Sequence, residues 1–324
     1  MKKKITGKIT WVLIISTIMA ANLRAQERND VIKVYNEGAR AIQTDVQAAI
    51  TAFENVVTLS DKVGESVNDL RQKAVQVLPG LYVKAASNAL SEKKPAAEVI
   101  KAAREAAKAA DKYGSVSAKE NAEKILMQGY YNMGTGYFSS KDYDNALLAF
   151  DSILAINPDF TSAIYNKALI YRIQNNLPGF EENIDLFIAK EKEANETARA
   201  DQASKLALEL FRAAGSQANQ ENKLDEALSL LNKAAKYGDD KDLCYYFADV
   251  FNKQKDFEKG EAYAQKGLDM ETGDAEAKAK FFFELGLAQE GKGKIAEACA
   301  SFKNALYGPF AQAAKAKRTN LKCQ

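Results

Sequence analysis

Apolar and small residues recur every three or four positions along most of the chain, which is the spacing of one face of an α-helix. The pattern is clearest in residues 127–160, where two such faces follow each other across a polar turn. The first face consists of Tyr130, Met133, Gly134 and Tyr137, and the second of Ala146, Phe150 and Ile153. Pro158 then ends the unit. This stretch predicts two helices packed as a hairpin.

The same pattern returns four times before the C-terminus. Its small and aromatic positions are Ala168 and Tyr171 in the second unit, Gly215, Ala227 and Leu231 in the third, Ala248, Phe251, Phe257 and Gly260 in the fourth, and Leu285, Gly286, Ala298, Phe302 and Ala305 in the fifth. We find no strong alternating strand pattern and no Asn-Gly or Asp-Gly hairpin turn. The periodicity therefore predicts an all-helical repeat protein.

These units closely resemble the tetratricopeptide repeat, a pair of helices about 34 residues long with small and aromatic residues at fixed positions. The resemblance implies an all-α fold, a right-handed superhelical solenoid of about seven helix-turn-helix hairpins plus a C-terminal capping helix. It assigns the close packing of paired helices to Gly134, Tyr137, Ala146, Phe150, Ala168, Tyr171, Gly215, Ala227, Ala248, Gly286, Ala298 and Phe302.

The repeat pattern also predicts the domain organisation. We expect a signal peptide in residues 1–25, degenerate hairpins in 26–116, regular repeats in 117–308, and a capping helix and tail in 309–324. The regular repeats fall at about 127–160, 161–194, 208–240, 241–274 and 279–312. The boundary at 116 rests on Ser117 and Glu120, which have the spacing of a capping box at a helix N-terminus.

The degenerate hairpins carry the same residue types at looser spacing. The first contains Tyr35, Gly38, Ala49, Phe53 and Val56, and the second contains Tyr82, Ala86, Ala96, Ile100 and Ala103. Pro79-Gly80 and Lys93-Lys94-Pro95 predict breaks between helices.

The second regular unit departs from the pattern. Leu177-Pro178-Gly179-Phe180 stands where the turn between helices and the next small residue should be, so we expect its second helix to be displaced. The segment Ala189–Ser204 is additional to the repeat. We interpret it as a lengthened, solvated pair of helices, with a protruding docking element as the alternative.

Composition and charge exclude several classes of function. The chain of 324 residues contains no histidine, which excludes Ser-His-Asp and Cys-His nucleophiles and imidazole-ligated metal sites. Five basic residues and no acidic residue lie in residues 1–25 beside a short apolar stretch, as in a secretory signal peptide cleaved after Ala25. A retained N-terminal anchor is the alternative, since Leu23 is not a small residue.

The rest of the chain carries slightly more acidic than basic residues, so no basic patch indicates a nucleic-acid partner. We expect no transmembrane segment in the mature chain, no metal, no cofactor and no enzyme activity; the oligomeric state is not predicted. Asp239-Asp240-Lys241-Asp242 lacks the alternating acids and distal Glu of a calcium loop, so helix capping and a solvated turn are the better interpretation.

The three cysteines do not form a disulfide framework. Cys244 occupies a packing position and should be buried. A disulfide between Cys299 and Cys323 is possible if the capping helix folds back, and the sequence leaves this open. In that helix we expect Phe310, Ala313, Ala314 and Leu321 to cover the fifth unit, and Gln312, Lys315, Lys317 and Arg318 to meet water.

In the family that the chain resembles, ligands usually bind the concave groove lined by the first helix of each hairpin. By register, the groove residues here are Tyr131, Thr135, Phe138, Tyr165, Leu169, Arg172, Arg212, Ser216, Asn219, Tyr245, Asp249, Asn252, Lys253, Phe283, Leu287 and Glu290. Tyr131 and Thr135 replace the Lys and Asn with which chaperone-tail-binding members clamp a terminal carboxylate. The aromatic groove residues predict either a partner-binding surface or additional core packing.

The sequence therefore predicts a secreted, periplasmic scaffold or adaptor of the bacterial cell envelope that binds a protein partner, a peptide or a helix, in its groove. A protein that binds or processes the cell-wall polymer is the alternative, although no pair of acidic residues in a recognisable catalytic motif supports it. An architectural protein that polymerises end to end is a third possibility, which the predicted capping helix opposes.

Overall fold

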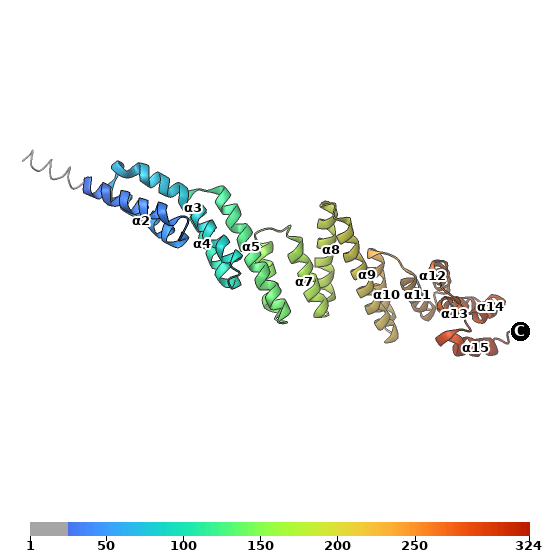
Figure 1. Cartoon of the computed structure of the whole chain (residues 1–324). Helices are drawn as coiled ribbons and strands as arrows, with labels where there is room; N and C mark the ends of the chain where they lie inside the picture. Colours follow the sequence, from blue (N-terminus) through green and yellow to red (C-terminus); the bar gives the residue numbers. More distant parts are fainter. Residues whose placement is uncertain (1–24) are drawn as a thin grey trace, which may run out of the picture. The chain divides into compact units, whose positions relative to one another are not determined.

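The computed structural model describes residues 25–324, and every regular element in that part is a helix (Figure 1). The predicted signal peptide, apart from Ala25, lies outside the described residues. The chain divides into two compact units, the first ending at Ile170 and the second running from Tyr171 to Gln324. The predicted boundary at 116 marks a change of sequence pattern and remains a prediction.

The first unit consists of helices that follow one another along the chain. After the helical residues 25–41 come α2 (Val46–Val63), the short 3₁₀-helix η1 (Glu65–Val67), α3 (Asn68–Ser91), α4 (Ala96–Tyr113), α5 (Val116–Ser139), α6 (Tyr143–Leu154) and α7 (Thr161–Ile173), in which the division between the units falls. From α2 to α6, each α-helix packs against the next one in the chain.

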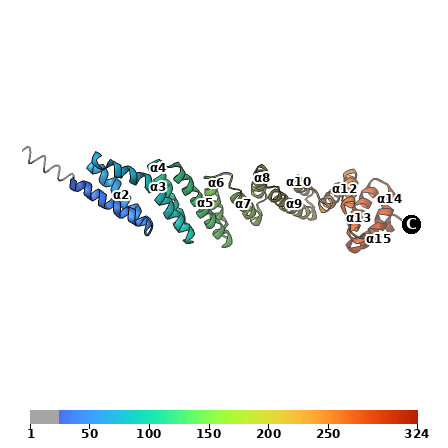
Figure 2. The ribbon, with the colours of Figure 1, turned by 45° about the horizontal axis from the view of Figure 1, so that its top comes forward.

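The second unit has the same organisation. Its helices are α8 (Leu177–Glu193), α9 (Thr197–Gln220), α10 (Leu224–Tyr237), α11 (Lys241–Lys253), α12 (Phe257–Met270), α13 (Ala275–Gly291), α14 (Ile295–Asn304), the 3₁₀-helix η2 (Gly308–Phe310) and α15 (Ala311–Asn320). Both views of the ribbon show α15 beside α13 and α14 (Figures 1 and 2). Within each unit, consecutive helices pack as pairs, and a final helix ends the described chain, so the predicted all-α fold of helical hairpins is confirmed.

Small residues allow the paired helices to approach each other closely. A Cβ added to Gly134 of α5 would lie 2.8 Å from the ring of Phe150 on α6, and one added to Gly286 of α13 would lie 2.7 Å from Phe302 on α14. Both phenylalanines are completely buried. The same small–large pairing in two different hairpins is the physical basis of the repeat that the sequence displays.

Two helix boundaries differ from the predictions. The N-cap of α5 is Ser115, whose hydroxyl accepts the N–H of Ala118 at 3.4 Å, so the predicted capping box from Ser117 to Glu120 is wrong by one half-turn. Pro79 does not break α3. Leu78 and Leu81 are both buried in the core of the first unit, and this burial outweighs the cost of about 3 kcal/mol for proline inside a helix. The break predicted at Lys93–Pro95 does separate α3 from α4.

The irregular second repeat has a longer second helix, because α8 contains 17 residues and α6 contains 12. Leu177 begins α8 instead of lying in a turn, because the Asn176 side chain accepts the N–H of Gly179 at 3.0 Å and Pro178 fits the first helical turn. The additional segment Ala189–Ser204 forms the end of α8, a short turn and the start of α9. These helix bounds agree with the lengthened helix pair that was the favoured interpretation of this segment.

A disulfide joins Cys299 to Cys323, which resolves the alternative left open by the sequence. Ala314 is buried and Phe310 and Leu321 are half-buried, as expected, but Ala313 is exposed. Lys317 and Arg318 were expected to face water; instead Lys317 pairs with Glu290, and Arg318 donates to the carbonyl oxygen of Cys299 at 2.6 Å.

The cysteines make a directly testable prediction. Cys244 is fully buried, and this burial raises the pKa of its thiol to about 12, so it should be unreactive in the folded chain. We expect iodoacetamide to modify no cysteine of the native protein, Cys299 and Cys323 after mild reduction, and Cys244 only after unfolding. Peptide mass mapping measures the three sites, and labelling of Cys299 without reduction would contradict the disulfide.

Candidate functional site

The first helices of three hairpins, α9, α11 and α13, lie side by side in the second unit, with contacts between α9 and α11 and between α11 and α13. Most of the predicted groove residues of this unit, from Arg212 to Glu290, project from these helices. The arrangement brings residues that are about one repeat apart in sequence into contact, and it does so through two sets of polar bonds.

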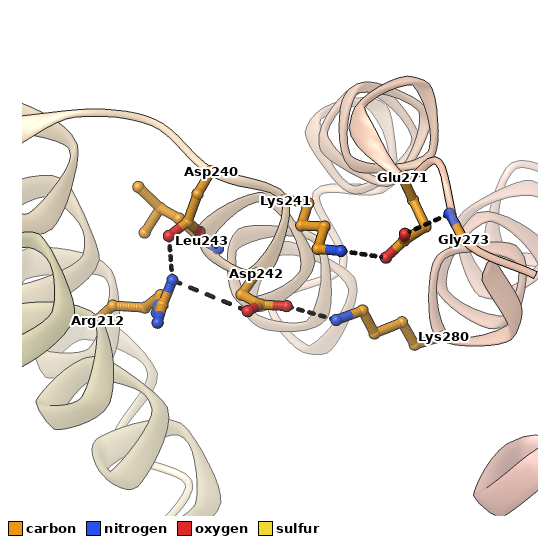
Figure 3. Close-up of polar contacts among 8 residues, drawn as sticks. All are labelled: Arg212, Asp240, Lys241, Asp242, Leu243, Glu271, Gly273 and Lys280. Carbon is orange, nitrogen blue, oxygen red and sulfur yellow. Dashed lines mark hydrogen bonds and ion pairs between the residues drawn. The ribbon is translucent and has the colours of Figure 1, made fainter. Parts of the chain in front are cut away.

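The first set joins the three helices near the start of α11 (Figure 3). Arg212 of α9 pairs with Asp240, and its guanidinium is 3.9 Å from Asp242. The other oxygen of Asp242 pairs with Lys280 of α13 at 2.5 Å. We call Arg212, Asp240, Asp242 and Lys280 the charge ladder.

The charge ladder affects the ionisation of Asp242. Partial burial opposes ionisation of this carboxyl, but Lys280 and then Arg212 and Lys241 outweigh it and lower its pKa. Beside the ladder, Lys241 pairs with the buried Glu271 at 2.8 Å, and the N–H of Gly273 donates to the same carboxylate (Figure 3). These two bonds lower the pKa of Glu271.

The acidic run from Asp239 to Asp242 therefore has structural partners. Asp240 is the N-cap of α11 and accepts the N–H of Leu243 at 2.7 Å, as predicted. The expectation of a merely solvated turn is incomplete, because Asp242 links two helices. Among residues 25–324, no cluster of three acidic or cysteine side chains could hold a metal ion.

The second set of polar bonds lies further along the same helices, by two to three turns on α9 and α11 and by one turn on α13. Asn219 of α9 donates to Asp249 of α11 at 2.7 Å, and Lys253 donates to both. Asn252 of α11 donates to the carboxyl group of Glu284 at 2.8 Å and to its backbone carbonyl at 2.9 Å. Four predicted groove residues therefore form hydrogen bonds that link neighbouring repeats: Asn219, Asp249, Asn252 and Lys253.

Glu284 is the most strongly perturbed acid of this region. Its side chain is on α13 and only 3% of the residue is exposed. Burial, and then the nearby charge of Asp249, raise its pKa to about 8, against the opposing effects of Asn252 and Lys253. Glu284 is therefore largely protonated and uncharged at neutral pH.

Asn252 explains why glycine stands at position 260, where the repeat pattern has alanine. A Cβ on Gly260 would lie 2.1 Å from the Asn252 Oδ1 atom. That amide is 8% exposed and cannot move away without breaking its bonds to Glu284. We expect Gly260→Ala to lower the free energy of unfolding by about 1–3 kcal/mol, despite the higher helix propensity of alanine.

Urea denaturation followed by circular dichroism measures this effect. Gly136→Ala on α5 is the matched control, because no side chain or neighbouring helix lies within 4 Å of its added Cβ, so it should be neutral or slightly stabilising. If the clash with Asn252 is the cause, the double variant Asn252→Ala, Gly260→Ala should lose less than the sum of the two single losses. Additive losses would contradict the explanation.

Residues of α11, α12, α13 and α15 line an open cavity of about 510 Å³. It is lined by Asp249, Asn252, Lys253, Phe257, Phe283, Glu284, Leu287, Glu290, Gly291 and Lys317. Phe257, Phe283 and Leu287 give it apolar walls, while Lys253, Glu290 and Lys317 are charged. We call this cavity the C-terminal groove.

The predicted groove aromatics pack more extensively than a free binding surface would require. Tyr131 lies against Phe150 and Phe160, with ring centroids 6.2 and 6.0 Å apart. Tyr245 lies against Tyr246 and Phe281, and burial raises its pKa. These contacts favour the packing alternative for Tyr131 and Tyr245.

The other predicted groove residues are distributed over both units. Phe138 packs against Tyr143, and the hydroxyl of Thr135 donates to the backbone carbonyl of Tyr131 at 2.9 Å. On α7, Tyr165 and Leu169 are half-buried, whereas Arg172 is exposed. Asn252, Lys253 and Phe283 line the C-terminal groove, and Asn219 bonds to Lys253.

Several residues of this region were not predicted from the sequence. Lys280 and Asp242 carry opposite charges and lie about one repeat apart in the sequence. They can be identified as partners only when the two repeats are aligned in the correct register. Glu284 has no sequence signal, because an acidic residue in an amphipathic helix is normally solvated. Lys317 was assigned to solvent, since nothing in the sequence places the final helix over the groove.

No protein-family model and no curated protein match the chain. Solved structures do align with it at low identity. The MamA protein is 19% identical over 61% of this chain and 96% of that one, with a TM-score of 0.34. A tetratricopeptide repeat protein from Parabacteroides merdae is 16% identical over 92% and 99%, with a TM-score of 0.30.

A third solved structure, YrrB, is described as a tetratricopeptide repeat protein with an unusual peptide-binding site. It is 17% identical over 63% of this chain and 96% of that one, with a TM-score of 0.35. Superpositions at these scores do not identify a function. The helix pairs and the packing of Gly134 on Phe150 and of Gly286 on Phe302 show a fold of helical hairpins.

Proposed function

We propose that this chain, which is built of tetratricopeptide repeats, is a non-catalytic scaffold that binds a protein segment in the C-terminal groove. The cavity of about 510 Å³ carries the proposal, because apolar walls with a few charged groups suit a peptide or helix side chain. The polar bonds between α11 and α13 support it further, since they join two helices that line the groove and hold them in place before a partner arrives.

We further propose that the scaffold works in the bacterial cell envelope, on the outer side of the inner membrane. The signal-like sequence of residues 1–25 supports export. The disulfide between Cys299 and Cys323 is compatible with it, because disulfides persist in oxidising compartments such as the periplasm. Within residues 25–324, no helix has the length and apolarity that a bilayer crossing requires.

Co-purification from solubilised envelopes tests the groove. The full chain, tagged after residue 25, is compared with Leu287→Glu, which places a charge in an apolar wall, and with Lys253→Glu, which alters the charged part. Lys303→Glu on the exposed surface of α14 is the matched control. Circular dichroism checks that each variant folds.

We expect a partner that the native chain and the Lys303→Glu control capture equally and that the groove variants lose. The Lys253→Glu variant decides the test if Leu287→Glu does not fold. A partner retained by both folded groove variants would place the binding surface elsewhere. Recovery of the native chain in the cytoplasmic fraction would contradict the envelope location.

A further inference from the structure

The C-terminal segment, residues 308–324, contacts the groove helices as well as the last hairpin. The ring of Phe310 lies against Tyr245 of α11 and Phe283 of α13, with centroids 6.3 and 5.5 Å apart. Lys317 lines the C-terminal groove and pairs with Glu290 at 2.7 Å. A capping helix that only covered α14 would need neither contact.

The segment has the pattern of an amphipathic helical ligand. Phe310, Ala314, Lys317 and Leu321 recur every three or four residues and so share one face. Ala314 is fully buried, in a cluster that includes Phe283 and Leu287. On α13, the residues Phe283, Leu287 and Glu290 repeat the same spacing in the same direction. Phe310 thus meets an aromatic ring at one end of the stripe, and Lys317 meets a carboxylate at the other.

A covalent bond keeps this helix on the groove. The segment is attached to the preceding chain at Tyr307 and a second time by the disulfide between Cys323 and Cys299. Arg318 adds a hydrogen bond to the carbonyl of Cys299 at 2.6 Å. Without the disulfide, one peptide connection, at Gly308 with φ of +50°, would remain beside the non-covalent contacts. The disulfide therefore restricts the release of this helix.

We propose that the C-terminal segment is an intramolecular ligand that covers the edge of the C-terminal groove, and that the groove and this edge, once uncovered, bind an amphipathic helix of a protein partner with the same stripe. That stripe is an aromatic residue, a small residue one turn later, and a lysine or arginine two turns after the aromatic. The inference rests on the proposed function of the groove and specifies the chemistry of its partner.

Release proceeds through thiol–disulfide exchange with a dithiol reductant. One thiolate of the reductant attacks a sulfur of the Cys299–Cys323 bond and forms a mixed disulfide, while the other cysteine leaves as a thiolate and takes up a proton. The second thiol of the reductant then displaces the remaining cysteine. Two electrons and two protons pass to Cys299 and Cys323, and the reductant leaves as a disulfide.

A labelled peptide provides the test. The probe is a fluorescein-labelled peptide of residues 308–324 with Cys323→Ser, and its fluorescence anisotropy reports binding to the full chain. The native oxidised chain is compared with a released chain that carries Phe310→Ala, Lys317→Glu and Cys323→Ser, which removes the internal contacts and the covalent bond. A second peptide with Phe310→Ala and Lys317→Glu is the matched control.

We expect the released chain to bind the probe at least about tenfold more tightly than the oxidised chain does, because a tethered segment competes at a high effective concentration. The control peptide should bind the released chain at least about tenfold more weakly than the probe. If the released chain does not fold, the native chain reduced by dithiothreitol replaces it, with tighter probe binding than in the oxidised state as the expected result.

Equal binding of the probe to the oxidised and the released chains would overturn the proposal, as would equal binding of the two peptides. Absence of probe binding to a folded released chain would overturn it as well. None of these results decides the proposed function, which the co-purification experiment tests separately. Capture of an envelope partner that depends on Leu287 and Lys253 would still establish groove binding, with a partner of different chemistry.

Discussion

Phe150→Ala is expected to lower the free energy of unfolding of the first unit by about 3–5 kcal/mol. The Phe150 side chain is completely buried, in a core formed with Ala146, Ile153 and Ile170. Its ring covers Gly134, which has no side chain that could fill the space left by the substitution. The cavity can therefore close only if α5 and α6 move together, so the loss should lie near the upper part of the range observed for buried aromatic residues.

Hydrogen exchange followed by mass spectrometry measures this loss locally, which is an advantage because repeat arrays do not always unfold in one step. We expect faster exchange in peptides from α5 and α6. Leu148→Ala is the control on the same helix, since Leu148 is 64% exposed and its replacement should change the stability by less than about 0.5 kcal/mol. A loss below about 1 kcal/mol for Phe150→Ala would show that the hairpin does not depend on this packing.

The hairpins could be predicted from the sequence because their packing is a local steric rule. Gly134 faces Phe150, and Gly286 faces Phe302, at the same separation in two hairpins. Each pair lies within one repeat, so the chain displays both partners at a fixed spacing. A rule that repeats several times is recognised even where single positions, such as Gly260, depart from it.

The helix ends were harder to predict, since local signals compete there. Ser115 and Ser117 are both acceptable N-caps by composition, and the structure uses the first. Pro79 is a helix breaker by propensity, but the burial of Leu78 and Leu81 keeps α3 continuous. For Pro79, tertiary contacts therefore override a local signal that the sequence presents.

The polar partners of the groove residues were not predicted from the sequence. Register placed Arg212, Asn219 and Asn252 on the groove helices, and the structure agrees. However, these polar groups were interpreted as free to bind a partner, whereas Asp240, Asp249 and Glu284 occupy them. Their partners come from neighbouring repeats or from beyond a helix end, so pairing depends on how hairpins stack and not on any spacing inside one repeat.

Glu284→Gln should raise the stability of the second unit at neutral and alkaline pH and remove a large part of its pH dependence. The pKa of Glu284 rises from 4.5 to about 8 in the folded chain, because the carboxyl is buried and lies near Asp249. Between these two values the folded state keeps a proton that the unfolded state has lost. The folded state thus binds more protons, and stability must fall as the pH rises through this window.

The size of the effect follows from the shift of the pKa. One unit of pKa corresponds to about 1.4 kcal/mol, so the native chain should lose roughly 3 kcal/mol of stability between about pH 5 and pH 8 through this group. Glutamine is uncharged throughout and its carbonyl can still accept the hydrogen bond from Asn252. The variant should therefore match the native chain near pH 5 and exceed it by about 2–3 kcal/mol near pH 8.

Urea denaturation at a series of pH values, monitored by circular dichroism, measures both curves. Glu290→Gln is the matched control on the same helix, because Glu290 is partly exposed and paired with Lys317, so its removal should leave the fall in stability above pH 5 in place. A Glu284→Gln curve parallel to the native one would mean that the buried carboxyl does not hold its proton. In that case Lys253 and Asn252 would stabilise an ionised Glu284 inside the groove, and the groove wall would be charged rather than neutral at physiological pH.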